Sequence, residues 1–129
     1  MSLSALKKIF ILIICMLLIV FSLIEFFFSS FDALIQRRIV KISNLSSRYV
    51  SFGCKWIEKI CTFCGVKSCF KKSMIKKNFL MIFGKRPILN IGVSYTKNFK
   101  SHSWLELDKT NLYEHPNDEM KIINQIFYE

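Results

Sequence analysis

The stretch from Ser101 to Asp108 reads SHSWLELD, and it places a histidine on an alternating run that ends in acidic side chains. Successive side chains of a strand point to opposite faces, so His102, Trp104 and Glu106 share one face of it. This alternation predicts a half-buried strand. The histidine then has one of two roles: a structural one, in which a backbone carbonyl satisfies it, or a role in chemistry.

Turns and extended segments surround this strand. The segment ILNIGVSY at residues 88–95 and the polar residues 96–100 that follow it predict an antiparallel hairpin with the histidine strand. The sequence DKTN at residues 108–111 predicts a second turn, and LYE at residues 112–114 predicts a third short strand. We therefore expect a small antiparallel meander.

An amphipathic helix is expected upstream of the hairpin. Its apolar side chains recur every three or four residues from Leu45 to Phe63, with Asn44 as a candidate N-cap and Gly65 as a stop. Gly53 lies in the middle of this pattern, where it costs about 1 kcal/mol of helix propensity. The stripe predicts a helix that packs on a core.

Two further helices are expected. One runs from about Lys67 to Phe83, with Gly84 as its C-cap, and the other runs from Pro116 to Phe127 with Asn117 as its cap. At 129 residues the chain holds one domain at most, besides a membrane or docking segment. These elements together predict an α+β body in which helices precede a short antiparallel sheet.

The N-terminal region is almost continuously apolar. From Ile9 to Phe28 only Ser22 and Glu25 are polar, and the length is that of a membrane-spanning helix. The alternative is a helix that lies on the domain or on a partner. We divide the chain into an apolar helix with its basic flank at residues 1–42 and a second domain at residues 43–129.

Charge is unevenly distributed along the chain. The formal net charge is +10, and no acidic residue occurs between Glu58 and Glu106, whereas the C-terminal tail is acidic. Basic residues also flank the apolar run on both sides: Lys7, Lys8, Arg37, Arg38 and Lys41. The larger group after the run favours a cytoplasmic C-terminal body. A basic body attracts an anionic partner, but no recognised nucleic-acid-binding motif accompanies the charge.

The chain has five cysteines, which rules out a fully paired set of intramolecular disulfides. No cleavable secretory signal is convincing, because the apolar run is too long and no small-residue cleavage site follows it. We therefore expect reduced thiols in a cytoplasmic body.

Three side chains are candidates for catalysis. Cys69 falls in the first turn of the second expected helix, where free N–H groups and the helix dipole stabilise a thiolate; the alternative is an ordinary buried cysteine. A cysteine nucleophile needs a base, and the base needs an orienting acid. His102 supplies the base. Glu114 is the preferred acid, and Asp108 is its substitute.

Three motifs carry a family resemblance. The sequence CFKKS occupies residues 69–73, IGV occupies residues 91–93 after Gly84 and Pro87, and HSWLE occupies residues 102–106. They resemble the Cys-Leu-x-Arg-Ser, Ile-Gly-Val and His-Ala-Trp-Val-Glu motifs of one family, the protease half of the lasso-peptide biosynthesis B proteins. That family is transglutaminase-like and papain-related.

The resemblance covers the chain from Tyr49 to its end, and it implies a small transglutaminase-like domain. It implies that Cys69 is the nucleophile and His102 the base of a cysteine peptidase. The family's third catalytic residue is an aspartate, and Glu114 stands at the matching position. The family's arginine in the cysteine motif is Lys72 here, which cannot make bidentate contacts.

The resemblance also implies a biological role. Enzymes of this family remove the leader from a ribosomally made precursor peptide, beside a separate leader-recognition protein, and a lasso cyclase then closes the ring. The family also has a long apolar region before the domain. We therefore expect leader cleavage in trans, with no cofactor and no metal.

Two other interpretations remain at the level of sequence. Cys61-x-x-Cys64, with Cys54, Cys69 and His102, has the residue types of a structural zinc site, although a second paired motif is missing. Alternatively, the chain is a non-catalytic, small basic protein that associates with a membrane and binds anionic lipid or a partner.

Overall fold

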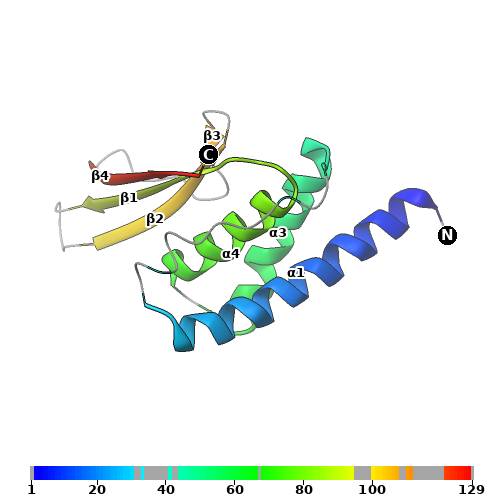
Figure 1. The fold of residues 1–129 in the computed structure, drawn as a ribbon, viewed down its shortest axis with the longest axis horizontal. Coiled ribbons are helices and arrows are strands. Elements are labelled where there is room, and N and C mark those ends of the chain that lie inside the picture. Colours follow the sequence, from blue (N-terminus) through cyan, green and yellow to red (C-terminus); the bar gives the residue numbers. More distant parts are fainter. Residues whose placement is uncertain are drawn as a thin grey trace.

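The computed structural model describes residues 2–30, 33, 41, 44–66, 68–94, 100–107, 110–111 and 121–128. The elements, in chain order, are helices α1 (Leu3–Phe28), α3 (Ser47–Phe63) and α4 (Cys69–Ile82), then strands β1 (Ile88–Ser94), β2 (Lys100–Leu107), β3 (Thr110–Asn111) and β4 (Lys121–Phe127). Helix α4 lies between the sheet on one side and α1 with α3 on the other (Figure 1). The expected α+β order, helices before an antiparallel sheet, is confirmed.

The described strands form one antiparallel sheet in the order β3-β2-β1-β4. The expected hairpin is confirmed, with Leu89 opposite Leu105 and Gly92 opposite His102. Leu89 and Leu105 are both buried in the core, on the face that packs on the helices. Because strand side chains alternate, His102 belongs to the other face of β2.

The C-terminal segment differs from the prediction. The expected helix from Pro116 to Phe127 is wrong, because Lys121–Phe127 forms strand β4 and pairs with β1. Adjacent isoleucines in this segment suit either structure, and the decisive contribution is the row of backbone hydrogen bonds that β1 offers. Residues 116–120 lie outside the described part of the chain.

The second turn is tighter than expected. Leu107 pairs with Thr110 and Glu106 with Asn111, so two residues placed in the turn belong to strand β3 instead. Only residues 108 and 109 separate the paired positions, and two-residue connections are the most common in hairpins. The expected strand at residues 112–114 lies outside the described residues.

Serines precede and glycines follow helices α3 and α4. Ser46, not Asn44, is the N-cap of α3, and Ser68 is the N-cap of α4. Gly65 and Gly84 follow the two helices at φ angles of 82° and 77°. Both were expected to stop a helix, and both are confirmed, because a left-handed residue favours glycine and lets the next N–H bond back to the helix.

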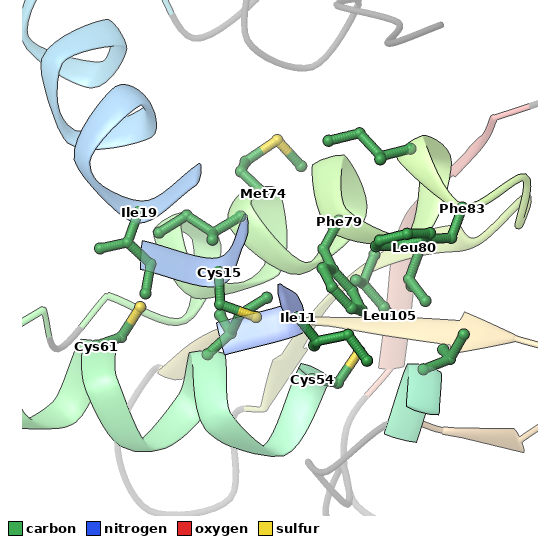
Figure 2. Packing of buried hydrophobic residues seen from close by; sticks show 14 of the residues in the cluster. Ile11, Cys15, Ile19, Cys54, Cys61, Met74, Phe79, Leu80, Phe83 and Leu105 are labelled. Atoms are coloured by element: carbon green, nitrogen blue, oxygen red, sulfur yellow. The ribbon is translucent and has the colours of Figure 1, made fainter. Parts of the chain in front are cut away.

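The core is shared by the three helices that the structure describes and the sheet. Figure 2 shows Cys15 of α1 between Cys61 and Cys54 of α3, and the same core cluster includes Phe79 of α4 and Leu105 of β2. Helix α3 runs unbroken through Gly53, whose missing side chain leaves room for the ring of Phe79. The close approach of α3 and α4 explains why glycine occurs at this position.

Three of the four lysines of α4 have partners inside the fold, whereas Lys71 is exposed. Lys76 and Lys72 form ion pairs with Glu58 of α3, with nitrogen–oxygen distances of 2.6 and 2.9 Å. Lys77 is buried, and its Nζ lies 4.9 Å from the centre of the Tyr128 ring. Since α4 is covered on two sides, these cations neutralise or stack on partners within the fold.

We expect Glu58→Gln to lower the free energy of unfolding by about 1 kcal/mol at neutral pH. Burial raises the pKa of Glu58, but the hydrogen bonds and charges of Lys76 and Lys72 outweigh it and hold the pKa below its ordinary value. A lowered pKa stabilises the fold above the unfolded-state value, and this contribution disappears as the pH falls through the folded-state value.

Urea unfolding of both proteins at pH 7 and pH 3 measures this effect. At pH 7 the wild type should have a larger free energy of unfolding than Glu58→Gln, and this difference should shrink at pH 3. A difference that is the same at both pH values would show that the charge of Glu58 does not stabilise the fold.

Among the described residues, α1 is the one helix that is long and apolar enough to cross a membrane. Length and composition alone support this reading, and a signal sequence or a core helix passes the same test. In the structure one side of α1 packs on α3 and α4. On that side, α1 lies on the domain, as the alternative to a membrane-spanning helix expects.

Candidate active site

An open cavity of about 450 Å³ lies where the start of α4 meets the sheet. It is lined by residues from three elements and the cap of α4: Ser68, Cys69, Phe70, Ile91, Ser101, His102 and Ser103. The wall of this cavity thus includes both Cys69 and His102, which are 33 positions apart in sequence. Ser103 faces α4, so by strand alternation the His102 side chain belongs to the opposite face of β2 and reaches the cavity from there. None of these described lining residues is a lysine, arginine, aspartate or glutamate.

Cys69 is the first residue of α4, and its side chain is partly exposed. The Ser68 side chain caps the helix by accepting a hydrogen bond from the Lys71 N–H, at 3.4 Å. A helix start presents unpaired N–H groups and the positive end of the helix dipole. This location stabilises negative charge on a sulfur or on an oxygen held beside it.

The other described cysteines differ from Cys69 in exposure. Cys54 and Cys61 are buried on α3, and burial raises their pKa to about 12 and about 11, respectively. Such thiols stay protonated and inert at neutral pH. Cys15 is also buried, whereas Cys64 is exposed but is not among the described residues that line the cavity.

His102 is half-buried, and its ring stacks on that of Trp104 at a centroid distance of 5.9 Å and an interplanar angle of 23°. Trp104 in turn covers Gly92 on the neighbouring strand. A Cβ added at Gly92 would lie 2.9 Å from two atoms of the Trp104 ring. The glycine therefore lets the tryptophan lie flat on the sheet, and the tryptophan supports the histidine.

A chain of polar side chains continues on the same face of the sheet. Gln125 donates a hydrogen bond to Asn90 at 2.9 Å, and Asn90 donates one to the Glu106 carboxylate at 3.3 Å. The amide of buried Asn90 is thereby satisfied on both its oxygen and its nitrogen. Glu106 thus has a partner within the sheet, two residues beyond Trp104.

Helix α4 is also tied to β2 beside the cavity. The Ser73 hydroxyl donates a hydrogen bond to the Ser103 carbonyl at 3.2 Å, and both residues are buried. Lys72, which stands in place of an arginine in the cysteine motif, bonds Glu58 and Thr62 of α3. It is not among the described residues that line the cavity.

The candidate acids Glu114 and Asp108 lie outside the described residues. For metal binding, no group of three His, Cys, Asp or Glu side chains comes together within the described ranges. The two cysteines of the CxxC motif differ in environment, since Cys61 is buried and Cys64 is exposed. The structure therefore offers no assembled zinc site among the residues that it describes.

A helix that starts with a partly exposed cysteine and packs on an antiparallel sheet bearing a histidine also agrees with comparison to known families. A family profile described as the transglutaminase-like superfamily matches residues 31–125, which is more than half of the chain. The chain belongs to the transglutaminase-like superfamily. No curated protein and no solved structure shows significant similarity to it.

The transglutaminase-like superfamily includes cysteine peptidases. Its matched region begins after α1, so this apolar helix precedes the family domain in sequence while packing on it in space. The superfamily membership confirms the fold expected from the resemblance of the cysteine and histidine motifs.

The sequence did not indicate a role for several residues around this transglutaminase-like cavity. Ser68, Ser101 and Ser103 line it, and Gly92 supports the Trp104 ring. Ser68 was detectable as a helix cap, and Gly92 stands out as a glycine within a strand, which marks a close approach. Their nearness to Cys69 depends on the packing of α4 on β2.

Proposed function

We propose that this chain is a cysteine peptidase that removes the leader from a ribosomally made precursor peptide during lasso-peptide biosynthesis. Cys69 is the nucleophile and His102 the general base and acid. Glu114 orients the histidine, with Asp108 as its substitute. The observation that carries the proposal is that Cys69 and His102 line one cavity of a transglutaminase-like fold.

The reaction begins when His102 takes the thiol proton and the Cys69 sulfur attacks the carbonyl carbon of the scissile bond. The resulting oxyanion is held by backbone N–H groups at the start of α4, where Cys69 is the first helical residue and the helix dipole is positive. His102 then protonates the departing amine, and the C–N bond breaks to leave a thioester.

Water completes the cycle. His102 removes a proton from the water, whose oxygen attacks the thioester carbon, and the C–S bond breaks to release the leader carboxylate and the thiolate. Phe70 and Ile91 give one part of the cavity wall an apolar character. They favour an apolar side chain of the precursor next to the scissile bond.

The proposed partners follow from the family resemblance. A separate recognition protein holds the leader, and a lasso cyclase acts on the released core. The peptidase body is cytoplasmic, in keeping with its basic flank after the apolar run. Residues 43–129 form the peptidase domain, and residues 1–42 carry the apolar helix and that flank.

The test is to incubate the full chain with the precursor encoded beside it and the recognition protein, and to identify the products by mass spectrometry. The proposal expects two fragments, cut at the junction of leader and core, whose masses add up to that of the precursor plus one water molecule. Omission of the recognition protein should slow the reaction. An intact precursor after incubation with both partners contradicts the proposal.

We expect Gly92→Ala to reduce the rate of leader cleavage about tenfold, because displaced catalytic groups lose orientation. The added methyl group meets the Trp104 ring at 2.9 Å and moves the surface that supports His102. The rate is measured by the same mass-spectrometric assay, with far-UV circular dichroism to verify folding. Trp56→Phe, introduced into both proteins, leaves Trp104 as the only source of tryptophan fluorescence. A shifted Trp104 emission with an unchanged cleavage rate would show that the position of this ring does not affect catalysis.

A further inference from the structure

Helix α1 has two apolar faces, and only one of them is packed. Ile11, Cys15 and Ile19 are buried in the core against α3 and α4. The opposite side, here called the outer face, consists of apolar side chains that are each at least 47% exposed: Ile13, Met16, Leu17, Val20, Phe21 and Ile24. A contiguous apolar surface of this size marks a binding surface for a partner or a membrane.

Two exposed cations lie near the two ends of α1, where its packed side borders the outer face. Lys7 lies at its N-terminal end, with Nζ 5.5 Å from the centre of the Tyr49 ring on α3. Lys71 of α4 lies towards the C-terminal half, with Nζ 5.9 Å from the centre of the Phe26 ring. The only acid in α1 is Glu25, which is half-buried, and the chain carries a formal charge of +10.

We propose that α1 lies in the plane of an anionic membrane surface, with its outer face in the acyl boundary and its inner face on α3 and α4. An interfacial helix needs a polar side away from the lipid, and the domain packed on α1 supplies it. Lys7 and Lys71 then meet the phosphates of the headgroups at the two ends of the apolar surface. A membrane also accepts a convex helix without a complementary groove.

A second copy of the chain fits this surface less well. Pairing two outer faces brings the lysines and the net positive charges of both copies together, and like charges repel. Anionic lipid neutralises the same charges. The charge pattern therefore favours lipid as the occupant of the outer face.

The packing of α1 distinguishes an in-plane helix from a spanning one. A spanning α1 would carry Ile11 and Ile19 away from the core and uncover Cys54 and Ile57 of α3 to water. An in-plane α1 keeps those contacts and still buries the outer face. This inference does not depend on the proposed peptidase activity.

Vesicle flotation of the full chain tests lipid binding. We expect it to float with vesicles of phosphatidylcholine and phosphatidylglycerol, to float much less with phosphatidylcholine alone, and to lose binding as salt is added. Leu17→Glu combined with Phe21→Glu should lower the partition coefficient at least tenfold. The matched control, Ile122→Glu with Ile123→Glu, makes the same charge change at exposed apolar residues of β4 and should bind like the wild type.

Any of three outcomes overturns the proposal. In flotation, either the wild type fails to bind anionic vesicles or the control variant loses as much binding as the α1 variant. In the absence of lipid, the chain forms a dimer that the α1 variant abolishes. Far-UV circular dichroism on each variant ensures that a loss of binding is not a loss of folding.

Cysteine labelling distinguishes the two orientations of α1. Leu3→Cys and Ser30→Cys place thiols at its two ends, in a background with Cys64→Ser and Cys69→Ser that removes the more accessible native thiols. An in-plane helix keeps both thiols from a membrane-impermeant maleimide in intact bacterial cells, and both react in inverted membrane vesicles. Labelling of one end in intact cells shows a spanning helix and overturns the proposal.

Discussion

Replacing Cys69 with alanine is expected to abolish leader cleavage, with kcat/KM falling at least about 10³-fold. The substitution removes the sulfur that forms the thioester while leaving α4 intact, since alanine is a good helix former. The measurement is release of the leader from the precursor in the presence of the recognition protein, followed by mass spectrometry. Circular dichroism should show an unchanged helix content.

Cys64→Ala is the matched control for this experiment. Cys64 is exposed and lies in the turn after α3, and it is not one of the described residues lining the cavity. Its replacement should leave the rate unchanged. If Cys69→Ala retains activity, or if Cys64→Ala loses as much, the nucleophile is not Cys69.

His102→Ala should reduce the rate to a similar extent, because nucleophile and base act as one unit and their losses are not additive. The double variant with Cys69→Ala should therefore be no slower than either single variant. A double variant whose losses multiply would show that the two residues act in separate steps.

The second large effect concerns the crossing of α3 and α4. Gly53→Ala is expected to lower the free energy of unfolding by about 2 kcal/mol, although alanine improves helix propensity by about 1 kcal/mol. The new Cβ would lie 2.6 and 2.9 Å from Cε1 and Cε2 of Phe79. That ring is fully buried and lies edge-on to the Phe83 ring, with the two ring centroids 5.0 Å apart. It therefore cannot move without displacing the core.

Urea unfolding of Gly53→Ala, Phe79→Leu and the double variant measures this effect as a cycle. Phe79→Leu alone destabilises the core by leaving a cavity, but it also frees the space above residue 53. The double variant should therefore be more stable than the sum of the two single effects predicts. A stabilised Gly53→Ala variant would show that the two helices separate at no cost.

Local sequence patterns were sufficient for the parts of the fold that local interactions decide. The alternation in Ser101–Asp108 predicted strand β2, and the apolar stripe through Gly53 predicted α3. Gly65 and Gly84 marked two helix ends because each takes a left-handed conformation that other residues rarely adopt. Each of these signals depends on neighbouring residues only.

The errors occurred where distant segments decide the structure. Residues Lys121–Phe127 have no strong local preference, and pairing with β1 makes them a strand. The sequence shows the lysines of α4 only as part of a basic body, whereas in the structure Lys76 pairs with Glu58 of α3 and Lys77 lies over the ring of Tyr128. A single sequence does not reveal that a helix with many lysines will be covered on two sides, as α4 is.

For the histidine strand SHSWLELD, the sequence by itself determined the chemistry that is available. It placed a histidine beside a tryptophan on a strand and a cysteine at a helix start, because secondary structure follows from residue spacing and capping. Only the tertiary structure decided that Cys69 and His102 line the same cavity and that Gly92 opposes His102 in the register. The physical reason is that the packing of α4 on the sheet sets these distances through contacts between residues far apart in the chain.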